Sequence, residues 1–163
     1  MFQGTVFQNG YVCADIEAAV AAFRARGQVR IIGPFDAELM LATARGPARQ
    51  VTRLAFVWQG GFQHELIQPV IDEAGLYGSD PLEGRGAGGG GLFAFHHAAM
   101  RVDDWDAFRA AVDAQELPVA VERAVEGDAL KFLYLDAREI CGHYLEYVWM
   151  TDERWAQLGG PQA

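Results

Sequence analysis

The sequence predicts an α+β fold in which two βαβββ modules form a cupped, eight-stranded mixed sheet with the helices outside. Two observations support this prediction. A pattern of strand, helix and three strands occurs twice, with the copies shifted by about 89 positions, and a glycine-rich segment separates them. The expected divisions are a first module at 1–70, a linker at 71–91, a second module at 92–150 and a C-terminal tail at 151–163.

The first module begins with a strand at residues 5–13, where β-branched and aromatic residues predominate. Asp15 can cap the helix that follows, and apolar residues then recur at helical spacing until Gly27 ends the pattern. An additional apolar run at 39–42 could extend either of its neighbours. The module is completed by three strand-like runs, at 29–34, 51–58 and 62–68.

The second module repeats this order. A strand at 92–102 precedes a capping residue, Asp104, and a helix with an apolar stripe that ends before Pro118. Three strand-like runs follow, at 119–125, 130–135 and 142–149.

The linker contains Gly84-Arg85-Gly86-Ala87 and then four consecutive glycines, Gly88 to Gly91. A phosphate-binding loop would end in Lys-Ser/Thr and open a helix, whereas this segment lacks that ending and precedes a strand. A flexible connector, or a lid over a site, is the better interpretation.

Four polar side chains occupy equivalent positions in the two copies. Because side chains alternate across a strand, the central positions of the first and last strand of each module should face the same side of the sheet. These positions hold Gln8, Glu65, His97 and Glu146. By the same alternation, Phe7 and His96 should point to the opposite face.

Buried carboxylates that face each other repel, and a divalent cation removes that cost. An amide, two carboxylates and an imidazole suit Zn, Ni, Co or Mn. Taken singly, a strand Glu is usually solvent-facing and a lone His is more often structural. The equivalence of all four positions under the duplication favours one divalent metal ion.

These segments resemble the vicinal oxygen chelate superfamily, which includes glyoxalase I, methylmalonyl-CoA epimerase, extradiol dioxygenases and bleomycin-binding proteins. The resemblance spans residues 5 to about 150 and is carried by four motifs. They are Gln8-Asn9-Gly10-Tyr11-Val12 with Asp15, His64-Glu65-Leu66-Ile67-Gln68-Pro69, His96-His97-Ala98-Ala99-Met100-Arg101-Val102-Asp103-Asp104, and Gly142-His143-Tyr144-Leu145-Glu146-Tyr147.

The resemblance implies that Gln8, Glu65, His97 and Glu146 hold a metal in the cup and that Glu146, with Glu65, moves a proton. The order Gln-Glu-His-Glu is similar to that of some glyoxalase I enzymes. Epimerases of the family more often have His at the first position, and the second acid that epimerase-like enzymes use has no match here. An iron dioxygenase would need a second His where Gln8 stands.

Two function classes follow. The first is a metal-dependent lyase or isomerase, glyoxalase I-like or acyl-CoA epimerase-like, that transfers a proton next to a carbonyl group. The second is a metal-free protein that binds or sequesters an antibiotic or aromatic ligand, with Phe95, Tyr144 and Trp58 as candidate contacts. A transferase or another lyase on the same scaffold remains open.

Net charge, cysteine content and the absence of targeting patterns limit the classes of binding partner and the cellular compartment that we expect. A net charge of −9 offers no basic surface for nucleic acid or lipid, so a small-molecule substrate is expected. Two cysteines without metal-binding spacing suggest reduced thiols, and no signal-peptide or membrane-spanning pattern is present, so we expect a cytoplasmic protein. We also expect a homodimer, because module edges need cover and Trp149, Trp155 and Leu158 could supply apolar contacts.

Overall fold

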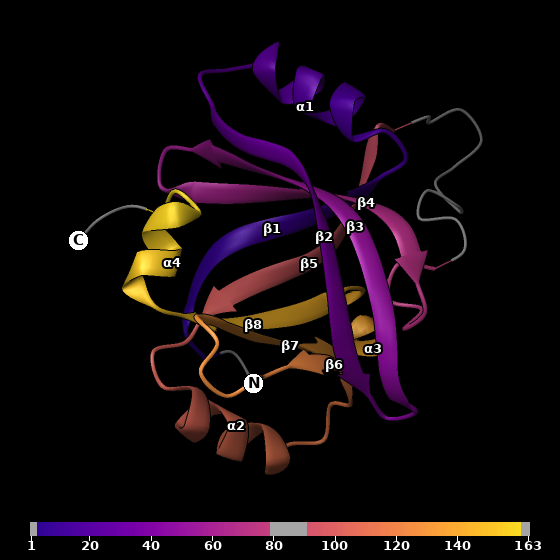
Figure 1. Ribbon diagram of the computed structural model, residues 1–163, viewed down its shortest axis with the longest axis vertical. Helices are drawn as coiled ribbons and strands as arrows, with labels where there is room; N and C mark the ends of the chain where they lie inside the picture. The colour runs from indigo at the N-terminus through magenta and orange to yellow at the C-terminus, as the bar shows by residue number, and fades with distance from the viewer. Residues whose placement is uncertain (1–2, 79–90, 161–163) are drawn as a thin grey trace.

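The computed structural model describes residues 3–78 and 91–160, and its eight strands close into a barrel-like cup (Figure 1). Around the ring the order is β1-β4-β3-β2-β6-β7-β8-β5. The α+β prediction is therefore confirmed. The strands are β1 Thr5–Cys13, β2 Arg30–Thr43, β3 Gly46–Gln59, β4 Phe62–Asp72, β5 Phe93–Arg101, β6 Val119–Arg123, β7 Leu130–Asp136 and β8 Tyr144–Met150.

Strand register shows that the two halves are equivalent. β1 and β5 run antiparallel through the centre, with Gln8 opposite Ala99 and Gly10 opposite His97. The two pairs are equivalent under the duplication, because Gln8 and Gly10 in β1 correspond to His97 and Ala99 in β5, 89 positions later. The last strands are equivalent too, because β4 and β8 each run parallel to the first strand of their module, with a shift of 81 positions between the two copies.

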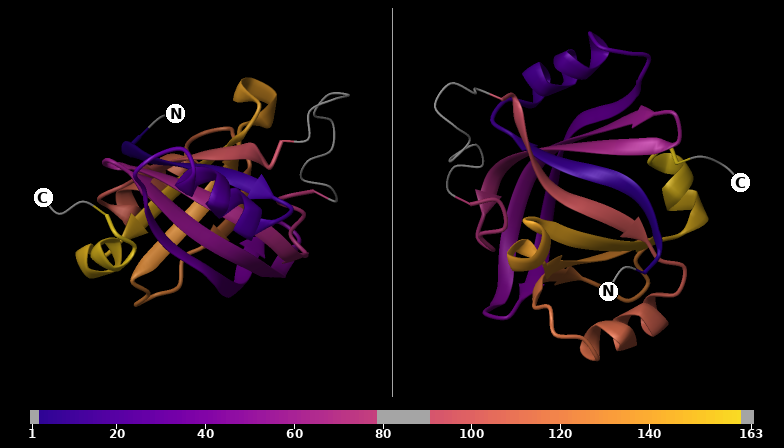
Figure 2. Two further views of the ribbon diagram at one scale, coloured as in Figure 1. Left: turned by 90° about the horizontal axis from the view of Figure 1, so that it is seen from above. Right: turned by 180° about the vertical axis from the view of Figure 1, so that it is seen from behind.

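Two helices cover the outside of the ring, at opposite ends in Figure 1 and in the right view of Figure 2. Helix α1, Ile16–Arg24, begins where Asp15 accepts a hydrogen bond from Ala18 N at 3.0 Å. Helix α2, Trp105–Asp113, begins in the same way, with Asp104 accepting from Ala107 N at 2.9 Å. The apolar stripe of α1 packs on β3 and β4, and that of α2 on β7 and β8. Both predicted caps are confirmed.

The first module has longer strands than the sequence suggested. The apolar run at 39–42 belongs to β2, which pairs along its length with β3. β4 continues to Asp72, two residues past the expected boundary, and its carboxylate then accepts hydrogen bonds from Leu76 N at 3.0 Å and Tyr77 N at 2.7 Å. An ordered turn therefore occupies the start of the expected linker. The glycines from Gly84 to Gly90 lie outside the described residues.

Two short helices were not predicted. Helix α3, Arg138–Cys141, connects β7 to β8, and helix α4, Asp152–Gln157, lies within the expected C-terminal tail. Thr151 caps α4 by accepting a hydrogen bond from Arg154 N at 3.2 Å. A single turn of helix has too few residues for an apolar periodicity to appear, so its packing reveals it only in the structure.

Helix α4 rests on one side of the cup. Trp155 meets Phe7 edge to face with ring centroids 5.2 Å apart, and it meets Trp58 in the same way at 5.6 Å. Trp58 Nε1 donates a hydrogen bond to the Leu158 carbonyl at 2.7 Å. Trp155 and Leu158 therefore make contacts within the chain, and the ring closes where Ala42 pairs with Glu122. Uncovered strand edges, and apolar contacts that Trp155 and Leu158 could offer to a partner, are therefore no longer reasons to expect a homodimer. The homodimer itself stays a prediction.

No helix within residues 3–78 and 91–160 is long and apolar enough to cross a membrane. Cys13 and Cys141 are both free thiols, as expected for reduced cysteines.

Candidate metal centre

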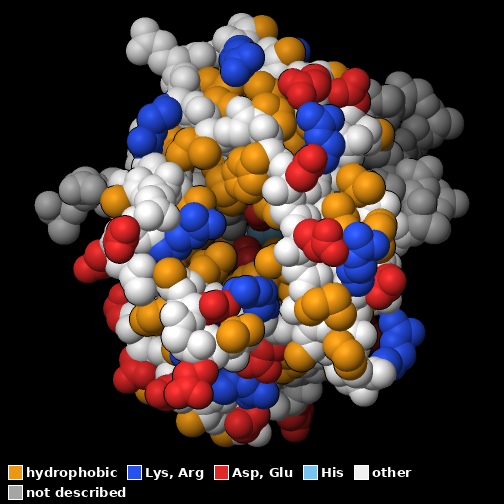
Figure 3. Space-filling model, viewed as in Figure 1, with side chains coloured by type: hydrophobic (Ala, Val, Ile, Leu, Met, Phe, Trp, Pro, Cys, Tyr) orange, Lys and Arg blue, Asp and Glu red, His pale blue; other side chains and the backbone are white. Residues whose placement is uncertain are grey.

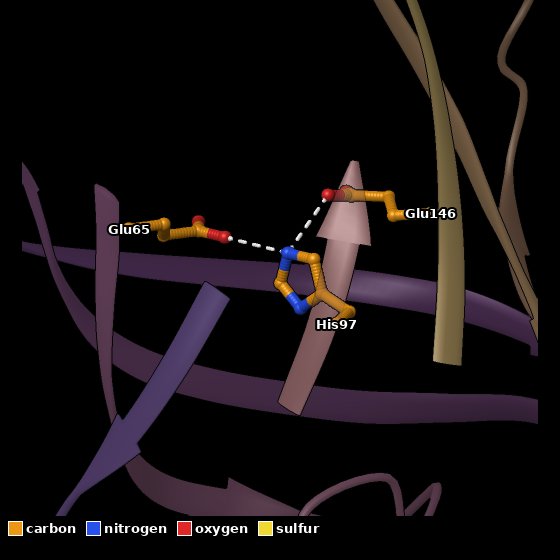
Figure 4. A group of neighbouring side chains, drawn as sticks. All are labelled: Glu65, His97 and Glu146. Carbon is orange, nitrogen blue, oxygen red and sulfur yellow. Dashed lines mark ion pairs between the residues drawn. The ribbon is translucent and has the colours of Figure 1, made fainter. Parts of the chain in front are cut away.

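Three of the four predicted ligands meet at the centre of the cup (Figure 4). His97 Nε2 lies 3.1 Å from a carboxylate oxygen of Glu146 and 3.4 Å from one of Glu65. One ligand atom from each residue falls within 4.8 Å of the others. His97 lies on β5, Glu146 lies on β8 beside it, and Glu65 lies on β4 beside β1. The duplication therefore brings Glu65 and Glu146, which are 81 positions apart in sequence, to either side of the His97 imidazole.

Gly10 creates the space for this imidazole. A Cβ at that position would lie 1.9 Å from His97 Cε1 and 2.3 Å from both ring nitrogens. At the equivalent place in the second module, Ala99 lies opposite Gln8, whose side chain has no ring. A glycine is therefore required only where the partner is the histidine.

His97 Nε2 faces negative charge without a regular hydrogen bond. It is fully buried, and although two carboxylate oxygens lie near it, the angles leave it without a hydrogen-bond partner among the described residues. Burial alone would lower the pKa of His97, but Glu146 and Glu65 outweigh that effect and raise this pKa to about 9. Burial raises the pKa of Glu65. The site therefore attracts a cation, whether a proton on His97 or a metal ion.

Gln8, the fourth predicted ligand, lies in the wall of the same cavity as Glu65 and Glu146. It is buried, and its Nε2 donates a hydrogen bond to Gln63 Oε1 at 2.5 Å. Gln63 Nε2 in turn donates to the Leu158 carbonyl at 3.5 Å. A carbonyl can only accept, so this chain leaves Gln8 Oε1 as the free acceptor, which is the atom that a metal would use.

Two predictions from strand alternation are wrong. Phe7 was expected to face the helices and His96 to point away from the cup. Phe7 lines the cup, and His96 contacts His97, with the two Nδ1 atoms 3.0 Å apart. The cause is a β-bulge at each place. Val6 pairs with Met100 and Gln8 with Ala99, which leaves Phe7 as an extra residue.

In the same way Tyr11 pairs with Phe95 and Gly10 with His97, which leaves His96 as the extra residue in β5. A bulge turns a side chain that would otherwise face away. Because Phe7 and His96 are 89 positions apart, the two bulges are equivalent under the duplication.

The cup encloses a cavity of about 170 Å³, visible as a central hollow with hydrophobic walls and acidic side chains inside it (Figure 3). Glu65 and Glu146 line it, as do Gln8 and the Arg154 side chain of α4. Its aromatic walls are Phe7, Phe35, Phe56, Tyr77, Phe132, Tyr134 and Trp155. A larger hollow of about 460 Å³ lies beside α1, but its described lining contains no carboxylate or histidine.

The aromatic contacts proposed from sequence lie elsewhere. Within the described residues, the cavity lining does not include Phe95, Tyr144 or Trp58. Phe95 packs on Tyr11 and His143, and Tyr144 packs on His96 and Tyr134. Trp58 instead supports Trp155. Strand alternation could not identify the true wall residues, because several come from β2, β3 and α4, whose positions depend on ring closure.

Two tyrosines near the carboxylates were also missed. Burial, and then the charges of Glu146 and Glu65, raise the pKa of Tyr134 well above its usual range. Tyr77 is partly buried beside the same carboxylates, and its pKa is raised well above its usual range by burial and then by the charges of Glu65 and Glu146. Both hydroxyls therefore stay protonated and can donate hydrogen bonds. Neither Tyr77 nor Tyr134 occupies one of the positions at which the two modules carry equivalent polar residues, so comparing the modules could not identify them.

The residues fit a divalent metal ion. A buried imidazole nitrogen without a hydrogen bond faces two buried carboxylates, the glycine opposite leaves room for the ring, and the donor set matches Zn, Ni, Co or Mn. A carboxylate pair of this kind is costly without a cation.

Comparison with known proteins gives a sequence-family match and a fold match. The profile of the Glyoxalase/Bleomycin resistance protein/Dioxygenase superfamily matches residues 7–134. No curated protein sequence matches the chain.

Solved structures with a similar fold include methylmalonyl-CoA epimerase from Mycobacterium tuberculosis, with a TM-score of 0.59 and 18% identity over 96% of this chain and 97% of that one. Streptomyces coelicolor methylmalonyl-CoA epimerase, in complex with 2-nitronate-propionyl-CoA, gives a TM-score of 0.60 and 19% identity over 93% and 97%. A hypothetical protein from Bacillus halodurans C-125 gives 0.62 and 15% over 91% and 95%. At these identities the likeness establishes a shared fold.

Proposed function

Because the chain belongs to the Glyoxalase/Bleomycin resistance protein/Dioxygenase superfamily, we propose that it is a metal-dependent lyase or isomerase that moves a proton at the carbon next to a carbonyl group. The observation that carries the proposal is the buried Glu65–His97–Glu146 group, in which His97 Nε2 faces both carboxylates without a hydrogen bond among the described residues. Gln8 completes the proposed ligand set through its free amide oxygen. When bound, a divalent ion supplies a Lewis acid that polarises the carbonyl and stabilises the negative charge that develops on its oxygen.

We assign the proton transfer to Glu146. Its carboxylate takes the proton from the C–H bond, the electron pair of that bond moves toward the carbonyl oxygen, and the same carboxylate returns the proton to the product. The Tyr134 hydroxyl, which stays protonated, lines the same cavity as this carboxylate and can donate a hydrogen bond. Glu65 lies on the other side of His97, and burial raises its pKa, so it is the second candidate base.

The cavity supports this chemistry by excluding water. Aromatic and aliphatic side chains form most of its wall, which lowers the local dielectric constant and makes a buried carboxylate a stronger base. The substrate class is suggested by the family and by the ligands of the epimerase structures, which are CoA thioesters. We therefore name α-hydroxy thiohemiacetals and 2-methyl-branched CoA thioesters as the first compounds to test.

The test is exchange of substrate hydrogen with solvent deuterium, measured by mass spectrometry with the protein loaded in turn with Zn, Ni, Co and Mn. Wild type should exchange with at least one compound. Glu146→Gln keeps the size and an oxygen donor, so it should slow exchange by roughly 100- to 10,000-fold while binding metal. Glu65→Gln is the matched control for the assignment. If only Glu65→Gln is slow, Glu65 is the base, and if wild type never exchanges, the proposal fails.

A metal-free binding protein is the second candidate, and the aromatic wall of the cavity favours it. Seven aromatic rings offer stacking surface for a flat apolar ligand. Metal analysis of purified protein separates the two candidates. Near-zero metal in wild type and His97→Ala alike, together with tight binding of an aromatic ligand, would favour the binder.

A further inference from the structure

His96 is a side chain at this site to which the proposed reaction assigns no role. The bulge in β5 turns it into the cup, where it lies among the rings of Tyr77, Tyr134 and Tyr144. Its Nε2 lies 3.0 Å from the Leu76 carbonyl oxygen, and its Nδ1 lies 3.0 Å from His97 Nδ1. Both ring nitrogens of His96 are therefore engaged, one by the backbone and one by the central histidine.

The proton positions in the hydrogen-bonded series from the Leu76 carbonyl through His96 to His97 follow from which atoms can donate and which can only accept. A carbonyl oxygen only accepts, so His96 Nε2 carries a proton and donates it to Leu76. Two nitrogens 3.0 Å apart share one proton between them. With His96 neutral, its Nδ1 is the acceptor, and His97 Nδ1 must be the donor. His97 Nε2 is then the nitrogen that points a lone pair, or a second proton, at Glu65 and Glu146 (Figure 4).

A positive charge belongs on His97 rather than on His96. Two carboxylates face His97, whereas the described surroundings of His96 are aromatic rings, His97, His143 and the cation of Arg138.

The Leu76 carbonyl, which begins this series of hydrogen bonds, is itself held in position. Leu76 is buried, and its backbone N–H donates to the Asp72 carboxylate at 3.0 Å. The adjacent Tyr77 N–H donates to the other oxygen of the same carboxylate at 2.7 Å. Asp72 thus holds the turn that presents the Leu76 carbonyl to His96, within the segment that the sequence suggested was part of the linker.

We propose that His96 is a positioning residue, which with the Asp72–Leu76 turn forms a hydrogen-bond relay that holds the proton of His97 on Nδ1 and directs its Nε2 at the two carboxylates. Metal ligation by a histidine nitrogen requires that the proton reside on the other nitrogen, and an acceptor for that proton both orients the ring and increases its basicity. The relay itself is a property of the metal-free chain, and its consequence for metal affinity rests on the proposed function.

The relay is tested first in metal-free, ¹⁵N-labelled wild type by nuclear magnetic resonance. We expect a slowly exchanging proton covalently bound to His97 Nδ1 and a scalar coupling across the hydrogen bond to His96 Nδ1. Packing alone would produce no such coupling. Absence of the coupling, or a proton bound to His96 Nδ1 instead, would overturn the proposal. This measurement needs no variant and no metal.

The consequence is tested with Zn²⁺ as probe, in competition with a chromophoric chelator, on a matched pair of variants. His96→Asn keeps an acceptor near the position of Nδ1, whereas His96→Gln keeps only a donor that can reach Leu76. We expect His96→Gln to weaken Zn²⁺ binding by about 10- to 100-fold and His96→Asn to retain most of the affinity. Equal affinities for both variants, whether weak or strong, would contradict the relay.

The two failures are distinguishable. If wild type takes up no Zn²⁺ at all, the proposed function falls, while the coupling between the two Nδ1 atoms still decides whether the relay exists.

Discussion

Replacing Gly10 with alanine should disable the metal centre although it replaces none of the proposed ligands. The added Cβ would lie 1.9 Å from His97 Cε1, whereas ordinary contact begins at 3.4 Å, so the ring would have to move by about 1.5 Å. A metal–ligand distance tolerates only about 0.2 Å. We therefore expect Gly10→Ala to weaken Zn²⁺ binding by about 100-fold or more, measured by chelator competition.

The same overpacking should cost stability, because His97 is fully buried and its ring is confined by His96 and Tyr134. A cost of about 1–3 kcal/mol is typical of overpacking. For a chain of this length it lowers the melting temperature by about 2–12 °C. Gly61→Ala is the matched control, because a Cβ there meets nothing within 4 Å, and we expect it to change stability by less than about 0.5 kcal/mol.

A double-mutant cycle isolates the cause. In a His97→Ala background the ring is gone, so adding Gly10→Ala should cost less than about 0.5 kcal/mol. The reasoning is refuted if the cost persists in that background, or if Gly10→Ala melts and binds Zn²⁺ like the Gly61→Ala control.

Three further predictions concern metal, thiols and assembly. A chelator should lower the melting temperature of metal-loaded wild type by about 5–11 °C, the equivalent of about 2.7 kcal/mol at a hundredfold excess over Kd, and should leave His97→Ala unchanged. A thiol reagent should label Cys141 in the native protein and Cys13 only after unfolding, because Cys13 is buried and its pKa is raised to about 11; two native thiols would contradict this. Light scattering should give twice the 17.9 kDa chain mass, and a monomer at micromolar concentration would refute the homodimer.

Sequence repetition predicted the site because a duplicated module reproduces its strand register. Glu65 and Glu146 are equivalent under the duplication, and so are Gln8 and His97, which is why four polar residues in apolar strands could be identified together. The helix caps were equally predictable, because a capping carboxylate acts on an amide three residues away and needs no tertiary partner.

Side-chain direction was less predictable, since alternation assumes an unbroken ladder. One extra residue in β1 and one in β5 reverse the direction of Phe7 and His96, and nothing in either residue type signals a bulge. The importance of Gly10 was also hidden. A glycine in a strand has several explanations, and only the register that sets it against the His97 ring selects one.

By itself, then, the sequence determined the two modules, their helices and the three side chains that converge, because these depend on local periodicity and on repetition. The tertiary structure decided the rest of the site. Ring closure brought wall residues from β2 and β3 together, α4 added Trp155, and the turn after Asp72 aligned the Leu76 carbonyl with His96. These contacts join residues whose separation in sequence follows no period, so only the closed fold defines them.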